Sequence, residues 1–578
     1  MVSVHSQRME APAPAAVTAA GWTGRHAVEL YVRTYSTMLQ SSGEIRLDSL
    51  AHAHVGMESS LHPLARQTQM DMGAFIYSVR RLPTEITHAR RVILGQSLLG
   101  FQAALGLDLG GWERVKAPAR RRAWYHDGLQ TLGVLLASPS DIDDLVPTLV
   151  AFQIEWNKLH RAIRDVGTDP ERVRIAVQAS EDDWARLRAA FGGEFEAMLV
   201  RAGQEERHLT LRMVGGSHIG YARGASRWWQ PVQAAIDEIG LTDAPVYFVS
   251  SNVHSLVNVL SGVARRFQSE IVDLVRHDDP DLAEELDKLE SGQTPASRDN
   301  WLYFAARALF DRHPRAGEFR RRRTELEREV GIRHVMPTST GIDSAAQVVR
   351  LADLDPRCLD PRVGEVDADA LRRSGAALVN VDYPLGLAAY HILRQVAEVS
   401  PWLLGVYVMG KAATLNADVG DVMIPNVVYN EHSGNTYWLD NCFTAADVQP
   451  HLLFGSVLDN QRAVCVRGTF LQNRDYLEFY YQGRYTVVEM EAGPYLDACF
   501  EIQQPGCYPM NDNVNMSRLS YDLGIIHYAS DTPYTQARTL GARGLDYRGT
   551  DSTYASAIAV ARRILRREGA LRESAGGA

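Results

Sequence analysis

Between residues 375 and 531, one repeated pattern strongly limits what the chain can fold into. Short apolar, β-branched runs alternate there with helical segments. The runs are GAALVNVD (375–382), LLGVYVMG (403–410), GDVMIPNVVYNEH (420–432), RAVCVRG (462–468), RYTVVEME (484–491) and LGIIHYASD (523–531). Near-continuous apolar strands separated by helices predict a sheet that is covered on both faces. The sequence therefore predicts an α/β domain, which we place at residues 331–568.

The chain before this domain has a different periodicity. Segments such as DDLVPTLVAFQIEWNKLHRAI (143–163) and ITHARRVILGQSLLGFQAAL (86–105) space their apolar residues as a helix does. We predict a mainly α-helical N-terminal region over 25–330. Its polar segment near 277–300 is either a linker that could divide the region into two subdomains or an exposed helix. A length of 578 residues agrees with more than one domain. The ends, 1–24 and 569–578, are expected to be disordered tails.

Composition excludes several classes of partner. The net charge of −10 argues against nucleic acid, and no apolar run is long enough for a membrane span. Five scattered cysteines fit reduced thiols, so a cytoplasmic protein is expected. The group His52, His54, Glu58 and His62 could be imagined as a metal site on a helix, but exposed or core histidines explain it better. We expect no metal and no cofactor.

Acids, a Gly-Lys turn and an aromatic residue follow several of the predicted strands, where ligands bind in α/β sheets. These residues are Asp382, Gly410 with Lys411, Phe470, Glu489 and Glu491 around Met490, and Ser530 with Asp531. Vicinal hydroxyls need a carboxylate acceptor, a flat heteroaromatic needs an apolar slot, and a leaving group needs an acid. The set therefore suits a sugar bonded to a base. Helix capping would explain any one acid alone, but three acids on separate strands favour a site.

These motifs resemble the nucleoside phosphorylase/nucleosidase superfamily. The resemblance rests on VMGKAATLNADVGDVMIP (408–425), VRGTFLQ (466–472), VVEMEA (487–492) and ASD (529–531), in the family's order. It covers about the last third of the chain, whereas the first 330 residues match no family motif. It implies a nucleoside phosphorylase-like fold, in which helices flank a mixed central sheet.

The resemblance also implies roles for individual residues. Glu491 is similar to the glutamate that accepts hydrogen bonds from the ribose hydroxyls, with Met490 packing on the sugar. Asp531 resembles the aspartate that protonates or hydrogen-bonds purine N7, and Ser530 would orient it. Phe470 looks like the aromatic that lines the base pocket. Glu489 would have a supporting or structural part.

Two residues depart from the family pattern. Phosphorolytic members have a glycine-rich loop after the first strand, whereas this chain has VDYPLG with Asp382. Asp382 resembles the water-activating carboxylate of hydrolytic members; the alternative is that it caps a helix beginning near Pro384. Lys411 stands where the family usually has a small residue. It would suit an anionic substrate such as a nucleotide, or it could pair with Asp382 or Glu491.

The resemblance thus implies an enzyme that cleaves the N-glycosidic bond of a purine nucleoside or nucleotide, with hydrolysis ahead of phosphorolysis. Phosphate is the further small-molecule partner that phosphorolysis would need. A protein that senses nucleotides without cleaving them is the alternative from another class. Members of the family are commonly oligomeric, so a homo-oligomer is expected.

Overall fold

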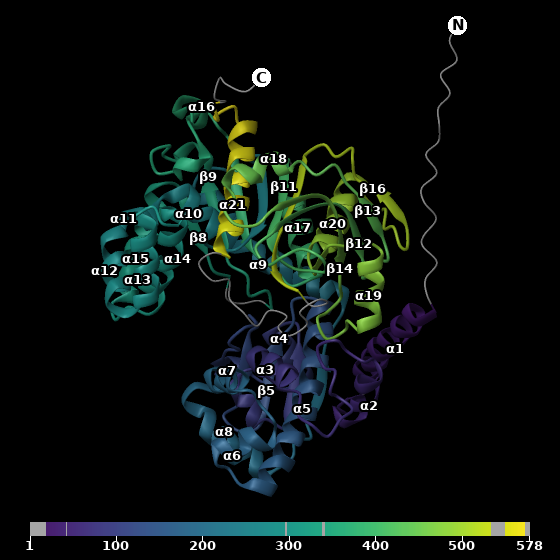
Figure 1. The fold of residues 1–578 in the computed structure, drawn as a ribbon. Coiled ribbons are helices and arrows are strands. Elements are labelled where there is room, and N and C mark those ends of the chain that lie inside the picture. Colours follow the sequence, from purple (N-terminus) through teal and green to yellow (C-terminus); the bar gives the residue numbers. More distant parts are fainter. Residues whose placement is uncertain are drawn as a thin grey trace.

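The structure is a computed structural model that describes residues 19–41, 43–294, 297–337, 341–400, 402–532 and 549–572. The chain forms an N-terminal unit (19–214) and a C-terminal unit (218–572), each built around its own sheet (Figure 1). None of the helices in the described ranges has the length and apolar character that crossing a membrane requires.

The N-terminal unit contains a mixed sheet, which has six strands within the described residues. Its strands, in spatial order, are β1 (Ile45–Arg46), β6 (Thr210–Val214), β2 (Arg91–Gly95), β5 (Thr131–Leu135), β4 (Trp124–His126) and β3 (Glu113–Val115). The helices are α1 (Ala19–Ser41), α2 (Asp48–Gly56), α3 (Met72–Arg81), α4 (Leu98–Leu105), α5 (Pro139–Val166), α6 (Pro170–Ala176), α7 (Glu181–Phe191) and α8 (Phe195–Gln204).

The prediction of a mainly helical N-terminal region missed this sheet. The segment 86–105, predicted as helix, is strand β2 followed by α4. Three consecutive apolar residues, Val92 to Leu94, suit a strand that is buried on both faces. A Cβ on Gly95 would lie 2.3 Å from the Phe101 ring, so the residue after them must be small.

The C-terminal unit contains a larger mixed sheet, with eleven strands among the described residues. Its strands are β16 (Asn513–Asn515), β13 (Thr436–Trp438), β12 (Val422–Asn430), β14 (Val457–Cys465), β15 (Val487–Glu489), β11 (Leu403–Thr414), β7 (Val246–Ser251), β10 (Ala377–Asp382), β9 (Ala346–Arg350) and β8 (Ile332–Val335), with β17 (Asp522–Asp531) paired to β11 and β12. Strands β11, β17, β12, β14 and β15 pair in a closed ring.

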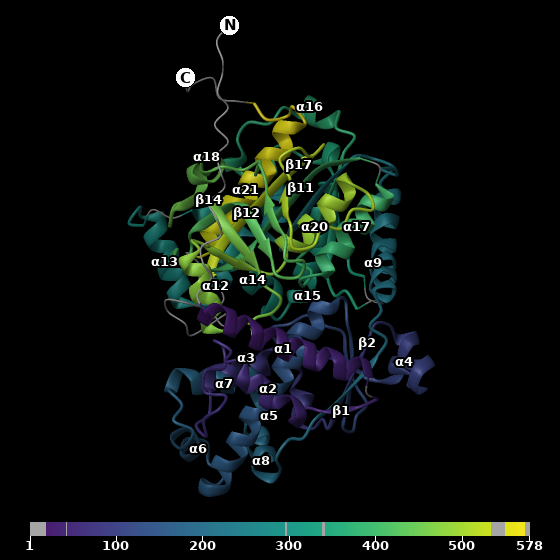
Figure 2. The ribbon, with the colours of Figure 1, turned by 90° about the vertical axis from the view of Figure 1, so that its right-hand side faces the viewer.

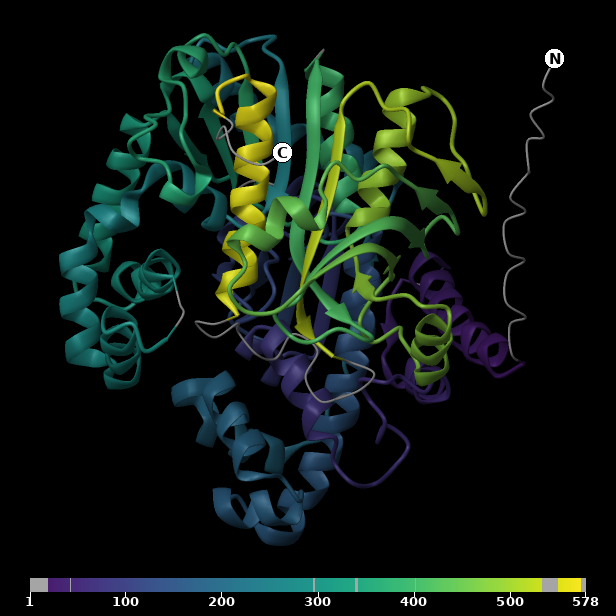
Figure 3. The ribbon, with the colours of Figure 1, turned by 45° about the horizontal axis from the view of Figure 1, so that its top comes forward.

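Helices cover the larger sheet on both faces (Figures 1 and 3). One face packs on α9 (His218–Glu238), α17 (Ala388–Val399) and α20 (Ala492–Gln503), and the other on α10 (Ser255–Ser261), α12 (Gln268–Asp278), α14 (Arg298–Asp311) and α21 (Thr550–Arg567). The remaining helices are α11 (Val263–Arg266), α13 (Pro280–Glu290), α15 (Ala316–Glu329), α16 (Ala368–Arg372), α18 (Ala445–Val448) and α19 (Arg474–Gln482). Successive residues of β7, such as Tyr247 and Phe248, enter opposite cores, as the two-residue period of a strand requires.

The domain boundary predicted at residue 331 crosses this sheet. Strand β7 lies between β10 and β11 and is parallel to both, although about 80 residues of helices separate it from the next strand. The C-terminal unit therefore includes β7 and the helices that follow it. Of the two interpretations of 277–300, the linker is wrong and the helix is confirmed, because α13 occupies residues 280–290 and Leu286 is buried in the same core.

Both predicted tails include residues that the structure places in regular elements. Helix α1 begins at Ala19, inside the predicted tail 1–24. At the other end, Ala570 is buried and Leu571 forms a β-bridge with Val366. Residues 1–18 and 573–578 lie outside the described part of the chain.

The two units share one hydrophobic core. Residues Phe470, Leu471 and Leu477 of the C-terminal unit pack in the same cluster as α1, α3 and α5. Figure 2 shows α1 crossing the junction between the units, beneath the larger sheet. The N-terminal unit thus covers the edge of the C-terminal unit at which β14 and β15 end.

Candidate active site

The ends of β10 and β15 meet at the junction between the units. The backbone N–H of Gly386, in the loop after β10, donates a hydrogen bond to Glu491 Oε1 at 3.3 Å. Tyr383 of the same loop donates to the Met409 carbonyl oxygen, and its hydroxyl lies 3.3 Å from that of Tyr528. Tyr383 therefore connects the Glu491 end of the site to β11 and β17.

Glu489 and Glu491 have different surroundings. Glu489 Oε2 accepts the backbone N–H groups of Glu491 and Ala492, at 2.6 Å each, at the start of α20. These bonds are those of a supporting residue. Burial, and then the neighbouring Glu491 charge, raises the pKa of Glu489 to about 8. Burial raises the pKa of Glu491 to about 7, against the opposing effects of Gly386 and Arg120. An interacting acid pair of this kind can share a proton near neutral pH.

A second group of candidate residues lies on β11 and β17. The Ser530 hydroxyl donates to Asp531 Oδ2 at 2.8 Å, which is the contact expected of a residue that orients Asp531. Burial lowers the pKa of Lys411, the Asp531 charge opposes this shift, and Arg307 adds to it. Among the acids of the site, Asp531 is thus the one whose charge acts on Lys411. The sequence had suggested that Lys411 could pair with Asp382 or Glu491. Position 410 has no room for a side chain, because a Cβ there would lie 2.8 Å from the Tyr383 ring.

The structure changes the interpretation of Asp382. Its carboxylate forms an ion pair with Arg121, which also donates to the Tyr383 carbonyl oxygen at 2.8 Å. The following helix, α17, begins at Ala388, so the suggestion that Asp382 caps this helix is wrong. The first strand of the larger sheet is β7, not β10, so Asp382 does not follow the first strand as the comparison with hydrolytic members assumed.

Phe470 does not lie with the other candidates. Its ring packs between the two units, against Tyr77 at a centroid distance of 5.1 Å and against His54 and His62. Because it is only 2% exposed, it is a core residue of the junction and does not line an open pocket. Met490 is half-buried and packs against the same core.

No group of three or more His, Cys, Asp or Glu side chains in the described part of the chain could hold a metal ion. His54 and His62 are buried, and their ring nitrogens lie 3.0 Å apart. His62 also lies 2.7 Å from Glu155. The two histidines are therefore members of a buried hydrogen-bond chain.

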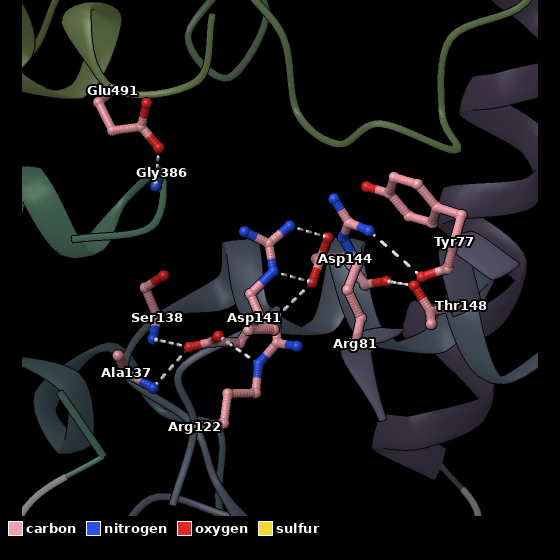
Figure 4. Close-up of polar contacts among 11 residues, drawn as sticks. Tyr77, Arg81, Arg122, Ala137, Ser138, Asp141, Asp144, Thr148, Gly386 and Glu491 are labelled. Carbon is pink, nitrogen blue, oxygen red and sulfur yellow. Dashed lines mark hydrogen bonds and ion pairs between the residues drawn. The ribbon is translucent and has the colours of Figure 1, made fainter. Parts of the chain in front are cut away.

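The N-terminal unit contributes a charged cluster that the sequence interpretation missed (Figure 4). Arg120 binds Asp144 through two hydrogen bonds, of 3.1 and 2.8 Å. Arg122 bridges Asp141 and Asp144 at 2.8 and 2.7 Å. Burial alone would raise the pKa of Asp144, but the charges of Arg120 and Arg122 hold it well below its ordinary value. The run ARRRAW (119–124) was the available signal, since three arginines beside a buried Trp124 are unusual for a solvated segment.

The start of α5 attaches this cluster to the C-terminal unit. Ser140 Oγ accepts the Leu387 N–H at 2.9 Å, and Arg467 bonds Asp143 at 3.1 Å. The backbones at Gly468 and Asp143 approach so closely that only a glycine fits at position 468, because a Cβ there would lie 2.9 Å from the Asp143 carbonyl oxygen. These contacts hold the arginines of the 120–122 loop beside the strand ends.

The fold is that of a mixed α/β protein with two mixed sheets. The chain belongs to a family of unknown function, DUF6909, whose model matches residues 47–566. No curated protein matches it.

Several solved structures resemble part of the chain. The 5′-methylthioadenosine/S-adenosylhomocysteine nucleosidase of Neisseria meningitidis is 16% identical, with a TM-score of 0.26 over 41% of this chain and 93% of that one. The S-adenosylhomocysteine nucleosidase of Streptococcus pyogenes is 12% identical, with a TM-score of 0.27 over 41% and 90%. A uridine phosphorylase of Schistosoma mansoni is 11% identical, with a TM-score of 0.25 over 33% and 71%. These matches to the nucleoside phosphorylase fold are partial, and at such TM-scores they carry no argument about activity.

Proposed function

We propose that the protein cleaves the N-glycosidic bond of a purine nucleoside or nucleotide. The observation that carries this proposal is Glu491, a half-buried carboxylate just after β15 that faces the loop after β10 and Arg120 of the N-terminal unit. A carboxylate in such surroundings is a strong acceptor for a pair of sugar hydroxyls, because little water competes for it.

The two groups of acids have separate tasks in this proposal. Glu491 holds the sugar hydroxyls and stabilises the positive charge that develops on the sugar as the bond breaks. Asp531, oriented by Ser530, gives a proton or a hydrogen bond to the departing base, so that the base leaves without negative charge.

The group that accepts the sugar is water or phosphate. Water is the first candidate, because the carboxylate of Asp382 borders the site. Phosphate is the second, because Arg120 and Arg121 border it as well. Hydrolysis gives the free sugar, whereas phosphorolysis gives a sugar 1-phosphate and requires phosphate in the assay.

An Asp531→Asn variant separates an enzyme from a sensor. Asparagine keeps the shape of the side chain but loses the acid, so we expect turnover to fall by about 10²–10⁴-fold while nucleoside affinity changes little. The control is Asp440→Asn, which replaces an exposed aspartate of the same unit. Equal turnover in the Asp531→Asn variant and the wild type would remove Asp531 from the chemistry.

A further inference from the structure

Arg81, the last residue of α3, is a buried cation beside the candidate site. It is 7% exposed, and its guanidinium carbon lies 3.4 Å from the centroid of the Tyr77 ring. Its Nη1 donates to the Tyr77 carbonyl oxygen at 3.2 Å. Figure 4 shows the phenol of Tyr77 and the guanidinium of Arg81 beside Asp144.

Two donors of this pair have no acceptor. Among the described residues, neither Nε of Arg81 nor the hydroxyl of Tyr77 has a hydrogen-bond partner, although Tyr77 is only 4% exposed. A buried polar group left without a partner costs about 1–3 kcal/mol, and more when it is charged. Two such donors on touching side chains therefore indicate an acceptor that both of them would bind.

The local charge balance indicates that this acceptor is an anion. Asp141 and Asp144 already bind Arg120 and Arg122, and no carboxylate in the described ranges lies within ion-pair distance of Arg81. The cluster thus holds three guanidinium groups against two carboxylates. Burial lowers the pKa of Arg81 to about 10 although the Asp144 charge opposes this shift, so the charge of Arg81 is only partly balanced.

The unpaired donors adjoin the proposed sugar site. The Arg120 guanidinium interacts electrostatically with both Tyr77 and Glu491. Arg120 is 21% exposed, so the cluster reaches solvent on that side. An anion bound by Arg81 would therefore lie next to a sugar held by Glu491.

We propose that Arg81, Tyr77 and Arg120 form a binding site for a phosphoryl group. Arginine and phenol donors match the oxygens of phosphate, and a dianion would reverse the excess positive charge of the cluster. This inference rests on the proposed function, because it assigns the phosphate-bearing partner of the same site. The group belongs either to the sugar of a nucleotide substrate or to inorganic phosphate that serves as co-substrate.

Titration calorimetry at low ionic strength tests this proposal with three probes that cannot lose a base: inorganic phosphate, ribose 5-phosphate and ribose. Tighter binding of ribose 5-phosphate than of either other probe assigns the site to a nucleotide. Binding of inorganic phosphate at least as tightly assigns it to a co-substrate. Failure of both phosphate compounds to bind the wild type overturns the proposal.

Two variants identify the site. Tyr77→Phe removes one hydroxyl without changing the packing, so we expect phosphate affinity to fall about five- to tenfold with an unchanged melting temperature. Arg81→Gln should lower it by about 10- to 100-fold. The control is Arg188→Gln, since Arg188 also stacks on an aromatic ring, Phe195, but is exposed. Wild-type affinity in the well-folded Tyr77→Phe protein would contradict the proposal.

The outcome is separable from that of the proposed function. Base release is followed by chromatography in a parallel sample of wild-type protein with nucleosides and nucleotides. Phosphate binding that depends on Tyr77 and Arg81, together with no base release, would keep the phosphoryl site and refute the cleavage. Base release without any phosphate binding would keep the cleavage and refute the site.

Discussion

At the scale of single residues, one methionine separates two glutamates that have different environments. Glu489 accepts hydrogen bonds from the backbone at the start of α20, whereas Glu491 faces the loop after β10. Only ionised Glu491 can accept two sugar hydroxyls, and its pKa is raised to about 7. We therefore expect kcat/KM to rise about tenfold per pH unit below an apparent pKa near 7 and to level off above it.

This rise should be absent from Glu491→Gln, whose residual activity we expect to be about 10²-fold lower and independent of pH in this range. The measurement is kcat/KM from pH 5.5 to 8.5 for both proteins. A wild-type profile that is flat across pH 7 would show that Glu491 does not need to ionise for the reaction.

Glu489 should affect stability through its proton. Its pKa is raised from an ordinary 4.5 to about 8, so between these values the folded protein holds a proton that the unfolded chain releases. The free energy of unfolding must therefore fall as the pH rises through this window. In Glu489→Gln, which cannot ionise, we expect this fall from pH 5 to 8 to be about 1–3 kcal/mol smaller. Urea unfolding of both proteins at pH 5 and pH 8 measures this difference. The same fall in the free energy of unfolding in both proteins would mean that Glu489 keeps its ordinary pKa.

At the scale of elements, the candidate site depends on how the start of α5 meets the loop after β10. Gly386 has a φ of +52°, and a Cβ on it would lie 2.3 Å from Ser140 Oγ. Gly386→Ala must therefore separate the two elements as well as strain the backbone. Gly240 is the matched control, because its φ is +71° but no atom lies within 4 Å of its Cβ position.

We expect Gly386→Ala to destabilise the protein by about 1–3 kcal/mol more than Gly240→Ala does, and to lower activity because Glu491 loses its backbone donor. Thermal unfolding and a turnover assay of both variants give the comparison. Equal effects in the two variants would mean that the contact between α5 and the loop contributes neither to stability nor to activity.

The elements also show what the sequence could reveal. The six apolar runs of 375–531 are β10, β11, β12, β14, β15 and β17, because buried strands have continuous apolar patterns. Strand β2 was missed, since three apolar residues beside a helix of similar composition fit a helical period equally well. The role of β7 was also missed, because its partners in the sheet are more than 120 residues away in sequence.

For the candidate site, local motifs pointed to Glu489, Ser530 and Asp531, which have partners within a few residues. Glu491 belongs to the same motif, although its own side chain is bonded by the distant Gly386. The arginines could not be assigned in this way. Arg121 reaches Asp382 across 261 positions of sequence, a pairing that depends on how the two units pack. Phe470 was misassigned for the same reason, since its neighbours come from α2 and α3.

At the scale of the whole molecule, the two units share one hydrophobic core, and both border the candidate site. Because β7 lies inside the larger sheet, a fragment of residues 331–578 would leave β10 and β11 without the strand between them. We expect this fragment to be unfolded or aggregated, with little cooperative thermal unfolding, whereas the full chain unfolds cooperatively. Circular dichroism during heating provides the comparison; a folded, cooperative 331–578 fragment would show that β7 is dispensable.

The central claim is that the junction of the two units cleaves an N-glycosidic bond, and the release of free base tests it most directly. Purified protein is incubated with purine and pyrimidine nucleosides and their 5′-monophosphates, with and without phosphate, and the products are separated by chromatography. We predict that a purine base appears with the wild type and that its rate falls by at least about 10²-fold in Glu491→Gln and Asp531→Asn. No base from any substrate under either condition, or equal release by the two variants, would contradict the account.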